Sequence, residues 1–150
     1  MSAGPRHLEV IYCDDIRQEI GNKLSYMGVY TGELSIPTAP LLLPKLCIAI
    51  RAVSELQDPF DALEIRVLRV KGTEETELLS TGPTTLSTDK PSTEGGMLHS
   101  MVAQFVFMLV PFPIDEEFLI RIRAKTEREE LGGAGLRVRV GKPLAAPTDK

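Results

Sequence analysis

The chain has 150 residues, of which 43% are hydrophobic and 25% are charged, and its formal net charge is −4. This length is usual for one domain, and the composition is that of a globular protein rather than a disordered or fibrous one. Only 5% of the residues are aromatic and none is Trp, which argues against a protein that stacks bases on aromatic side chains. We expect a single domain over residues 1–150, a core over about residues 7–140 and no nucleic-acid partner.

The N-terminal residues give no sign of export. The start, MSAGPRHLEV, lacks the apolar run of a signal peptide, and no apolar run in the chain is long enough to span a bilayer. Residues 1–6 are therefore expected to form a loose leader, and the protein is expected to be cytoplasmic with no membrane partner. Cys13 and Cys47 lie in apolar segments, where buried, reduced thiols are common.

A hairpin is predicted near the start of the chain. Residues 8–13 and 24–30 read as strands, and Gly21-Asn22 between them suits the positive backbone angles of a two-residue turn. A short helical turn is the alternative, because Asp15 followed three residues later by Gln18 resembles a capping box. We favour the hairpin.

The middle of the chain continues the β pattern. Residues 46–53 are mostly apolar, as in a central strand, and residues 62–71 alternate until Val67 and Leu68 break the register, which predicts a bulge near Leu68. Residues 81–96 are polar and rich in Thr, Pro and Gly. They are expected to form a long, mobile or disordered loop.

The segment from Met101 to Arg123 carries the clearest pattern. Residues 105–110 are apolar at every position, so a strand there needs cover on both faces and is expected in the centre of a sheet. Residues 118–125 and 134–140 instead alternate between apolar and basic side chains, as half-buried strands do. Residues 141–150 are expected to form a flexible tail.

Short strands separated by frequent turn signals, with almost no helical periodicity, predict an all-β domain. The strands differ in whether one or both faces are apolar. We therefore expect an antiparallel Greek-key β-sandwich of about seven to eight strands, of the immunoglobulin-like or C2-like type.

The candidate partner-binding residues are four arginines at outward positions of the last two strands: Arg121, Arg123, Arg137 and Arg139. If these strands pair as a hairpin, the four side chains share one surface, where like charges facing one another are destabilising. An acidic protein partner, a second subunit or a phosphate-bearing ligand would compensate, since guanidinium groups bind such groups in bidentate fashion. Local pairing is the other possibility, and its candidates are Glu64, Glu127, Glu129 and Glu130.

Asp14, Asp15 and Glu19 form the best acidic cluster and are the alternative site. Carboxylates ligate calcium when their oxygens converge on one point. On an extended strand, however, Asp14 points away from the other two and Arg17 lies between Asp15 and Glu19. A solvated, self-paired strand face is therefore the competing interpretation.

No catalytic site is predicted. The chain has neither a Gly-x-Ser-x-Gly nucleophile turn nor a phosphate-binding Gly-x-x-x-x-Gly-Lys loop. The two cysteines, His7 and His99 show no metal-ligand spacing, and His99 has no defined orienting acid. We expect a protein that is not an enzyme and holds no cofactor.

Several motifs resemble a family of small uncharacterised bacterial and prophage-associated proteins with a domain of unknown function. They are HLEVIYCDDIRQEIGNKLSYMGVYTGEL, LPKLCIAI, PFDALEIRVLR, and FVFMLVPFPI followed by LRVRV. Asn22 departs from the pattern, since a glycine is expected there. The resemblance implies a bacterial or phage origin and a β-sandwich, and nothing about catalysis.

Together these patterns predict a non-catalytic interaction or structural module, cytoplasmic or carried in a phage particle. Its contact surface is expected to be the arginine face or an apolar edge. The second possibility arises because residues 105–110 and 41–43 supply more apolar surface than a small sandwich easily hides, and self-association would cover it. A ligand- or cation-binding sandwich is the alternative.

Overall fold

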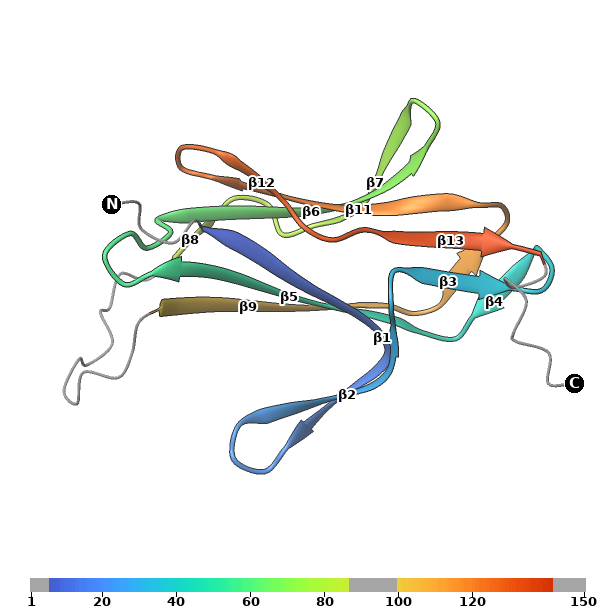
Figure 1. Cartoon of the computed structure of the whole chain (residues 1–150), viewed down its shortest axis with the longest axis horizontal. Coiled ribbons are helices and arrows are strands. Elements are labelled where there is room, and N and C mark those ends of the chain that lie inside the picture. The colour runs from blue at the N-terminus through green and yellow to red at the C-terminus, as the bar shows by residue number, and fades with distance from the viewer. Residues whose placement is uncertain (1–5, 87–99, 142–150) are drawn as a thin grey trace, which may run out of the picture.

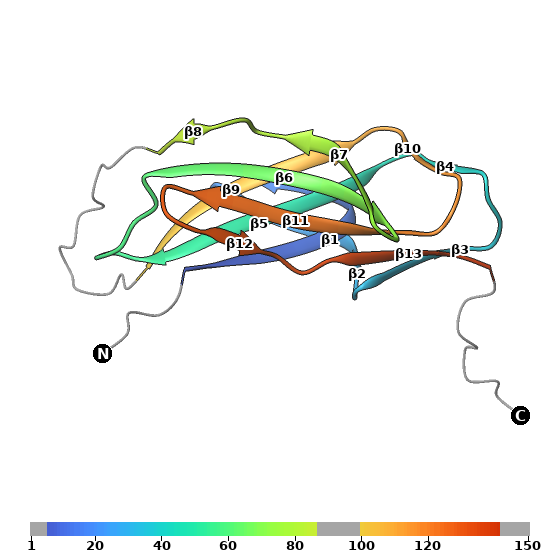
Figure 2. The same ribbon diagram turned by 90° about the horizontal axis from the view of Figure 1, so that it is seen from above.

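The computed structural model describes residues 6–86 and 100–141, which form thirteen strands and contain no helix. Two sheets lie face to face along the length of the molecule (Figures 1 and 2). The predicted all-β class and the β-sandwich are confirmed. No helix in the described part of the chain has the length and apolar character needed to cross a membrane.

The first sheet, sheet A, has the strand order β2-β1-β5-β9, and all its pairings are antiparallel. Its strands are β1 (His7–Glu19), β2 (Lys23–Tyr30), β5 (Leu46–Glu55) and β9 (Ser100–Leu109). The central place predicted for residues 46–53 is confirmed, because β5 lies between β1 and β9 and Leu46 to Ile50 are buried without exception.

The second sheet, sheet B, has the order β3-β13-β11-β6-β7. These strands are β3 (Glu33–Ile36), β13 (Leu136–Val140), β11 (Phe118–Thr126), β6 (Ala62–Lys71) and β7 (Glu74–Ser80). Two short strands join this sheet, β12 (Glu130–Gly132) beside β11 and β8 (Thr84–Thr85) beside β6. A separate pair consists of β4 (Leu41–Leu43) and β10 (Phe112–Ile114).

Two details of the predicted sandwich were wrong. The sandwich is not wholly antiparallel, because β3 and β13, far apart in the sequence, pair in parallel. The strands also exceed seven or eight, because the short strands β4, β8, β10 and β12 carry too few residues to show a periodicity. The bulge expected near Leu68 is confirmed by a register shift between Val67 and Leu68 in the pairing with β7.

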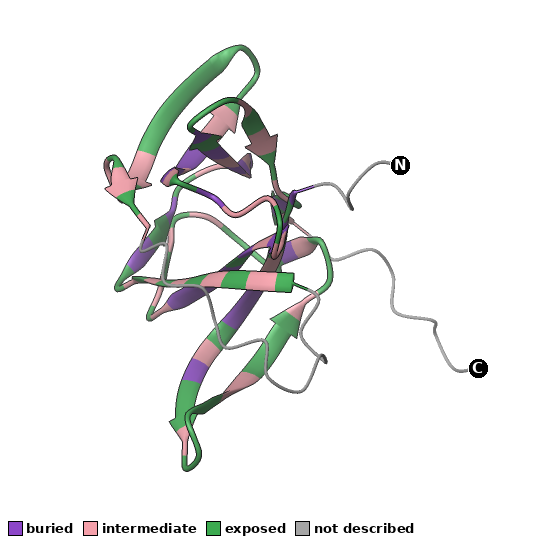
Figure 3. Cartoon of the chain, turned by 90° about the vertical axis from the view of Figure 1, so that its left-hand side faces the viewer, coloured by how far each residue is buried: buried purple, intermediate pink, exposed green. Residues whose placement is uncertain are grey.

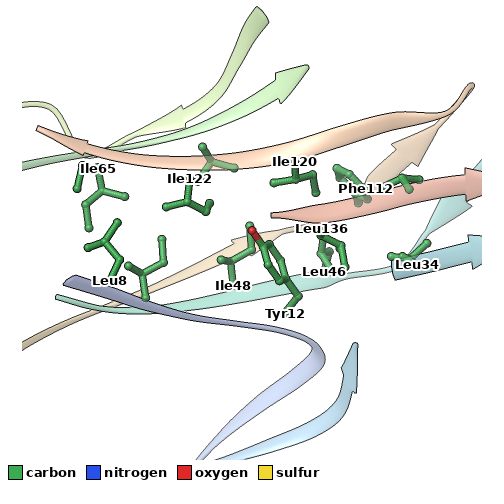
Figure 4. Close-up of a cluster of buried hydrophobic side chains, with 14 of the residues drawn as sticks. Leu8, Tyr12, Leu34, Leu46, Ile48, Ile65, Phe112, Ile120, Ile122 and Leu136 are labelled. Carbon is green, nitrogen blue, oxygen red and sulfur yellow. The ribbon is translucent and has the colours of Figure 1, made fainter. Parts of the chain in front are cut away.

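Side chains from the facing sides of both sheets fill one core (Figure 4). Sheet A contributes Leu8, Tyr12, Leu46 and Ile48, and sheet B contributes Ile65, Ile120, Ile122 and Leu136. Burying a side chain of this size stabilises the fold by roughly 1.5–3 kcal/mol. The sheets meet closely where β12 leads into β13, since a Cβ at Gly133 would lie 2.7 Å from Cγ2 of Val10.

The predicted hairpin between β1 and β2 is confirmed, and the alternative helical turn was wrong. The turn holds three residues rather than two, because Glu19 pairs with Lys23, and Gly21 and Asn22 have φ values of 90° and 60°. β1 bends along its length, and the outer half of the hairpin runs beneath the rest of sheet A, away from sheet B (Figure 1). It covers a second, small core on that face, consisting of Cys13, Ile16, Cys47 and Ala49.

The central position predicted for residues 105–110 was wrong. Residues 105–109 belong to β9 and Val110 follows its end; β9 pairs only with β5 and forms an edge of sheet A within the described chain. Exposed and half-buried residues alternate along this strand (Figure 3). The apolar pattern shows that burial of both faces of the strand is favourable. It does not show whether other residues of this chain bury them.

Other predictions fall on residues that the structure does not describe. These are most of the loop predicted over 81–96, the tail beyond residue 141 and the leader over residues 1–5. His99 also lies outside the described residues.

Candidate functional site

The four candidate arginines lie on the outer face of sheet B. On β11, Ile120, Ile122 and Ala124 point into the core and are fully buried, so Arg121 and Arg123 between them point outward. Leu136 and Val138 are buried on β13 in the same way, and Arg137 and Arg139 are exposed. The predicted alternation of both strands is confirmed.

A groove of about 490 Å³ on this face brings three of the four arginines together. Its basic residues are Arg121, Arg137, Arg139 and Lys71, and its acidic residue is Glu117. Val70, Phe118, Leu119 and Val138 also line it, and of these Val70 and Leu119 have partly exposed side chains. We call this feature the arginine groove.

Arg123 lies outside the arginine groove. It lines a neighbouring hollow of about 230 Å³ together with Glu64, Arg66, Lys125 and Glu130. The reason is the strand pairing: β13 lies opposite β11 only from Phe118 to Ile120, and β12 takes its place beside Arg123. The sequence pattern places all four arginines on one face but does not reveal this division.

Local glutamates pair with three of the arginines. Glu75 lies 3.2 Å from Arg123 and 4.0 Å from Arg121, and Glu33 lies 3.2 Å from Arg139. Of the glutamates expected from the sequence, Glu130 contacts this group, 3.7 Å from Arg123. The other two pairing residues come from β7 and β3, which the sequence did not link to the arginine strands.

Arg137 differs from the other three, because no carboxylate within the described residues lies within ion-pair distance of it. Its backbone neighbours across the sheet are Leu119 on β11 and Glu33 on β3, and Glu33 is already bound to Arg139 and to the hydroxyl of Ser35. Arg137 is therefore an exposed guanidinium with five donor N–H groups directed to solvent or to a partner.

The rim of the arginine groove at the β6–β7 turn is held by ion pairs. Lys71 bonds to Glu116, and Arg69 bonds to the same carboxylate at 2.8 Å and to Asp115 at 3.2 Å. The guanidinium of Arg69 also lies 4.4 Å from the ring centre of Phe118. These contacts join β6 to the segment before β11 and define one wall of the groove.

The structure does not bring Asp14, Asp15 and Glu19 together. Asp15 lies 2.9 Å from Lys45, whose ammonium donates to it and holds the pKa of the carboxyl below its ordinary value. Asp14 accepts a hydrogen bond from the hydroxyl of Tyr30. Among residues 6–86 and 100–141, no three Asp, Glu, His or Cys side chains are grouped so that they could hold a metal ion.

The side chain of Asp14 packs closely against the backbone of β2. Opposite it stands Gly28 with a φ of 67°, and a Cβ at this glycine would overlap the Asp14 carboxylate. The hydroxyl of Tyr30 has a raised pKa, because it is partly buried and donates to that carboxylate. Asp14 therefore stabilises the bend of the hairpin, which is a structural role.

Cys13 and Cys47 face each other across β1 and β5, and both are free and fully buried. Burial raises the pKa of both thiols above the ordinary value. The predicted burial of both cysteines is confirmed. Since thiolates are the reactive form of cysteine, these two are poor nucleophiles in the folded protein.

The sequence pattern missed a buried arginine, Arg6, and the group of residues that it contacts just before β1. Arg6 was expected in the loose leader, but its side chain is only 3% exposed and lies 2.7 Å from Glu127. It also donates to the backbone carbonyls of Asp58 and Pro59 and lies 4.6 Å from the ring centre of Phe60. A single arginine before a strand carries no periodic signal, so only the contacts made in the folded chain reveal it.

Known proteins do not assign a role to any of these features. The chain matches no known protein family, and no curated protein sequence matches it. The resemblance to small bacterial and prophage-associated proteins therefore stays a prediction.

Proposed function

We propose that this protein is a non-catalytic interaction module that binds an acidic segment of a partner protein in the arginine groove. The observation that carries the proposal is Arg137, an exposed guanidinium in a groove with three other basic side chains and no ion-pair partner within the described chain. Charge-assisted hydrogen bonds to a carboxylate are about twice as strong as neutral ones. An acidic side chain of a partner would complete this part of the surface.

The apolar floor of the groove favours a protein partner over a small anion. The partly exposed side chains of Val70 and Leu119 line the groove between the basic side chains. Interfaces between proteins combine a central apolar area with a polar rim. An extended segment with both acidic and apolar residues matches this lining. Its cellular setting, bacterial or phage-borne, is proposed from the sequence resemblance alone.

The proposal is tested by fluorescence anisotropy with a labelled peptide rich in glutamate and containing interspersed leucines. We expect Arg137→Ala to weaken binding by about tenfold or more, since one charge-assisted hydrogen bond contributes about 1.5–3 kcal/mol. Binding should also weaken with added salt, which screens exposed charges.

Arg123→Ala is the matched control, because it removes the same group from the same outer face of sheet B but outside the groove. The proposal fails if the peptide does not bind, or if both substitutions weaken binding equally. A peptide with lysine in place of glutamate, and inorganic phosphate as a competitor, separate recognition of an acidic segment from general adhesion and from anion binding.

A further inference from the structure

A second candidate contact surface is the edge of sheet A that β9 forms. Strand β9 pairs with β5 over ten consecutive residues without a register shift. No strand of the described chain pairs with its other side. In an antiparallel pair, alternate N–H and C=O groups of an edge strand point away from the neighbour. β9 therefore presents a regular row of unpaired backbone donors and acceptors.

Within its own residues, β9 lacks the features that usually prevent an edge strand from pairing with another chain. Charged side chains, prolines and bulges within an edge strand discourage pairing with another chain. From Ser100 to Leu109, β9 has no charged residue, no proline and no bulge. Its outward side chains carry no charge, and three of them are exposed and apolar: Val102, Val106 and Met108, which are 45%, 39% and 50% accessible.

We infer that two copies of this chain pair antiparallel through β9, which joins the two A sheets into one continuous sheet. A two-fold axis perpendicular to the sheet keeps inner faces with inner faces and outer faces with outer faces. The pair then covers Phe105 and Phe107, which face the core but stay half-buried at the edge. It also places uncharged outer residues beside uncharged outer residues, among them Met108 beside Val102.

Self-pairing fits this edge better than any other edge of the two sheets. β7, at one edge of sheet B, carries Glu74, Glu75 and Glu77, so two copies would bring like charges together. β3, at the opposite edge, is only four residues long and begins with Glu33. β2 begins with Lys23 and holds Gly28 in a left-handed conformation, which interrupts its edge. β9 alone is long, regular and uncharged.

The β1–β2 hairpin supplies an argument for a second copy rather than another peptide. A hollow of about 340 Å³ is lined by Asn22 and Lys23 from the hairpin turn and by Val102 and Gln104 from β9. The hydroxyl of Tyr26 also accepts a hydrogen bond from Gln104 at 3.2 Å. The hairpin turn therefore lies beside the N-terminal half of β9.

Antiparallel pairing sets the C-terminal half of the second β9 beside this N-terminal half. Val106 and Met108, which are exposed in a single copy, would then lie beside the hairpin turn of the other copy. That turn carries Ile20, an apolar side chain that is 95% exposed. The symmetric pair thus brings Val106 and Met108 of one copy close to Ile20 of the other. The two-fold axis repeats this contact, so it occurs twice in the dimer.

The test is the molar mass of the intact chain, measured by sedimentation equilibrium over a range of concentrations. We expect the wild type to reach twice the chain mass of 16.5 kDa. The variant V106K/M108K should stay at the single-chain mass, because its lysines would lie beside Val102, Gln104 and Lys23 of the other copy, and charged side chains within an edge strand discourage pairing.

The matched control is V29K/L42K, which adds the same charge at exposed apolar positions of β2 and β4 and should still dimerise. All four positions are solvent-exposed, so circular dichroism and thermal unfolding should show folded variants. Amide hydrogen exchange of the wild type gives a second readout without substitution, since alternate β9 amides should become protected as the concentration rises.

The inference fails if the wild type stays at the single-chain mass at its highest soluble concentration. It also fails if V106K/M108K dimerises like the wild type, or if open chains of many copies form. Added salt separates this result from the proposed function, because the β9 pair contains no ion pair, whereas peptide binding in the arginine groove weakens with salt.

Discussion

Replacement of Arg6 by alanine is expected to be the most damaging change of a charged residue in this fold. The guanidinium holds together the start of β1, the loop before β6 and the loop after β11. It bonds to both carboxylate oxygens of Glu127, at 2.7 and 3.2 Å, and to the carbonyls of Asp58 and Pro59, at 3.2 and 2.5 Å. Its loss would remove the donor to both carbonyls and to Glu127 Oε2, and would leave Glu127 Oε1 with the backbone N–H of Asp61 alone.

The size of the effect follows from burial. Breaking a buried ion pair by removing one partner costs about 3–5 kcal/mol. The side chain of Arg6 is 3% exposed but that of Glu127 is 24% exposed, so water can partly rehydrate the carboxylate. We therefore expect the lower end, about 3 kcal/mol, which lowers the midpoint of thermal unfolding by about 10 °C in a chain of this size.

Arg51→Ala is the control. Arg51 also forms an ion pair with a glutamate, Glu9, at 3.2 Å, but both of these side chains are nearly half exposed. Exposed pairs contribute about 0–1 kcal/mol. Chemical and thermal denaturation of both variants measures the difference. If Arg6→Ala destabilises the protein no more than Arg51→Ala, the buried cluster does not stabilise the fold and the argument is wrong.

The same cluster predicts a pH dependence. Arg6 donates to Glu127 and holds the pKa of that carboxyl below its ordinary value, with help from the backbone N–H of Asp61. Since the folded pKa lies below the unfolded value of about 4.3, the stabilisation is present above that pH. It is lost as the pH falls through the folded pKa. The difference in stability between wild type and Arg6→Ala should therefore narrow in acid.

Three further substitutions or probes test the structure. Gly28→Ala should destabilise the hairpin by more than Gly72→Ala in thermal unfolding, because both glycines have positive φ, but a Cβ meets the facing carboxylate only at Gly28. A thiol reagent should leave Cys13 and Cys47 unmodified in the native protein and label both in denaturant, and fast native labelling would contradict their burial. Tyr12→Phe should cost about 1–3 kcal/mol, because the buried hydroxyl donates at 2.5 Å to a carbonyl before β13; unchanged stability would show that the bond contributes little.

Strand positions were predictable wherever one face of a strand is buried. Residues 118–125 and 136–140 alternate between apolar and basic side chains, and the structure buries the apolar ones and exposes the arginines. The hairpin at Gly21-Asn22 and the bulge at Leu68 were also predictable, because each has a local backbone or register signal. These features depend on neighbours within a few residues.

The candidate site was only partly predictable. The outward direction of Arg121, Arg137 and Arg139 follows from alternation, but the groove that unites them needs the turn between β6 and β7 as a wall. Glu75 and Glu33 pair with the arginines through strands that are distant in sequence. No local pattern records which strand lies next to which, because pairing depends on the packing of the whole core.

The sequence alone determined the β class, the direction of most strand side chains and the outward direction of the arginines, because these follow from a two-residue period and from turn chemistry. The tertiary structure alone decided that β9 is an edge, that β3 pairs in parallel with β13, that Arg6 is buried and that Arg137 has no ion-pair partner among the described residues. Each of these depends on which segments become neighbours in space, and that choice is made by the packing of two sheets on one core.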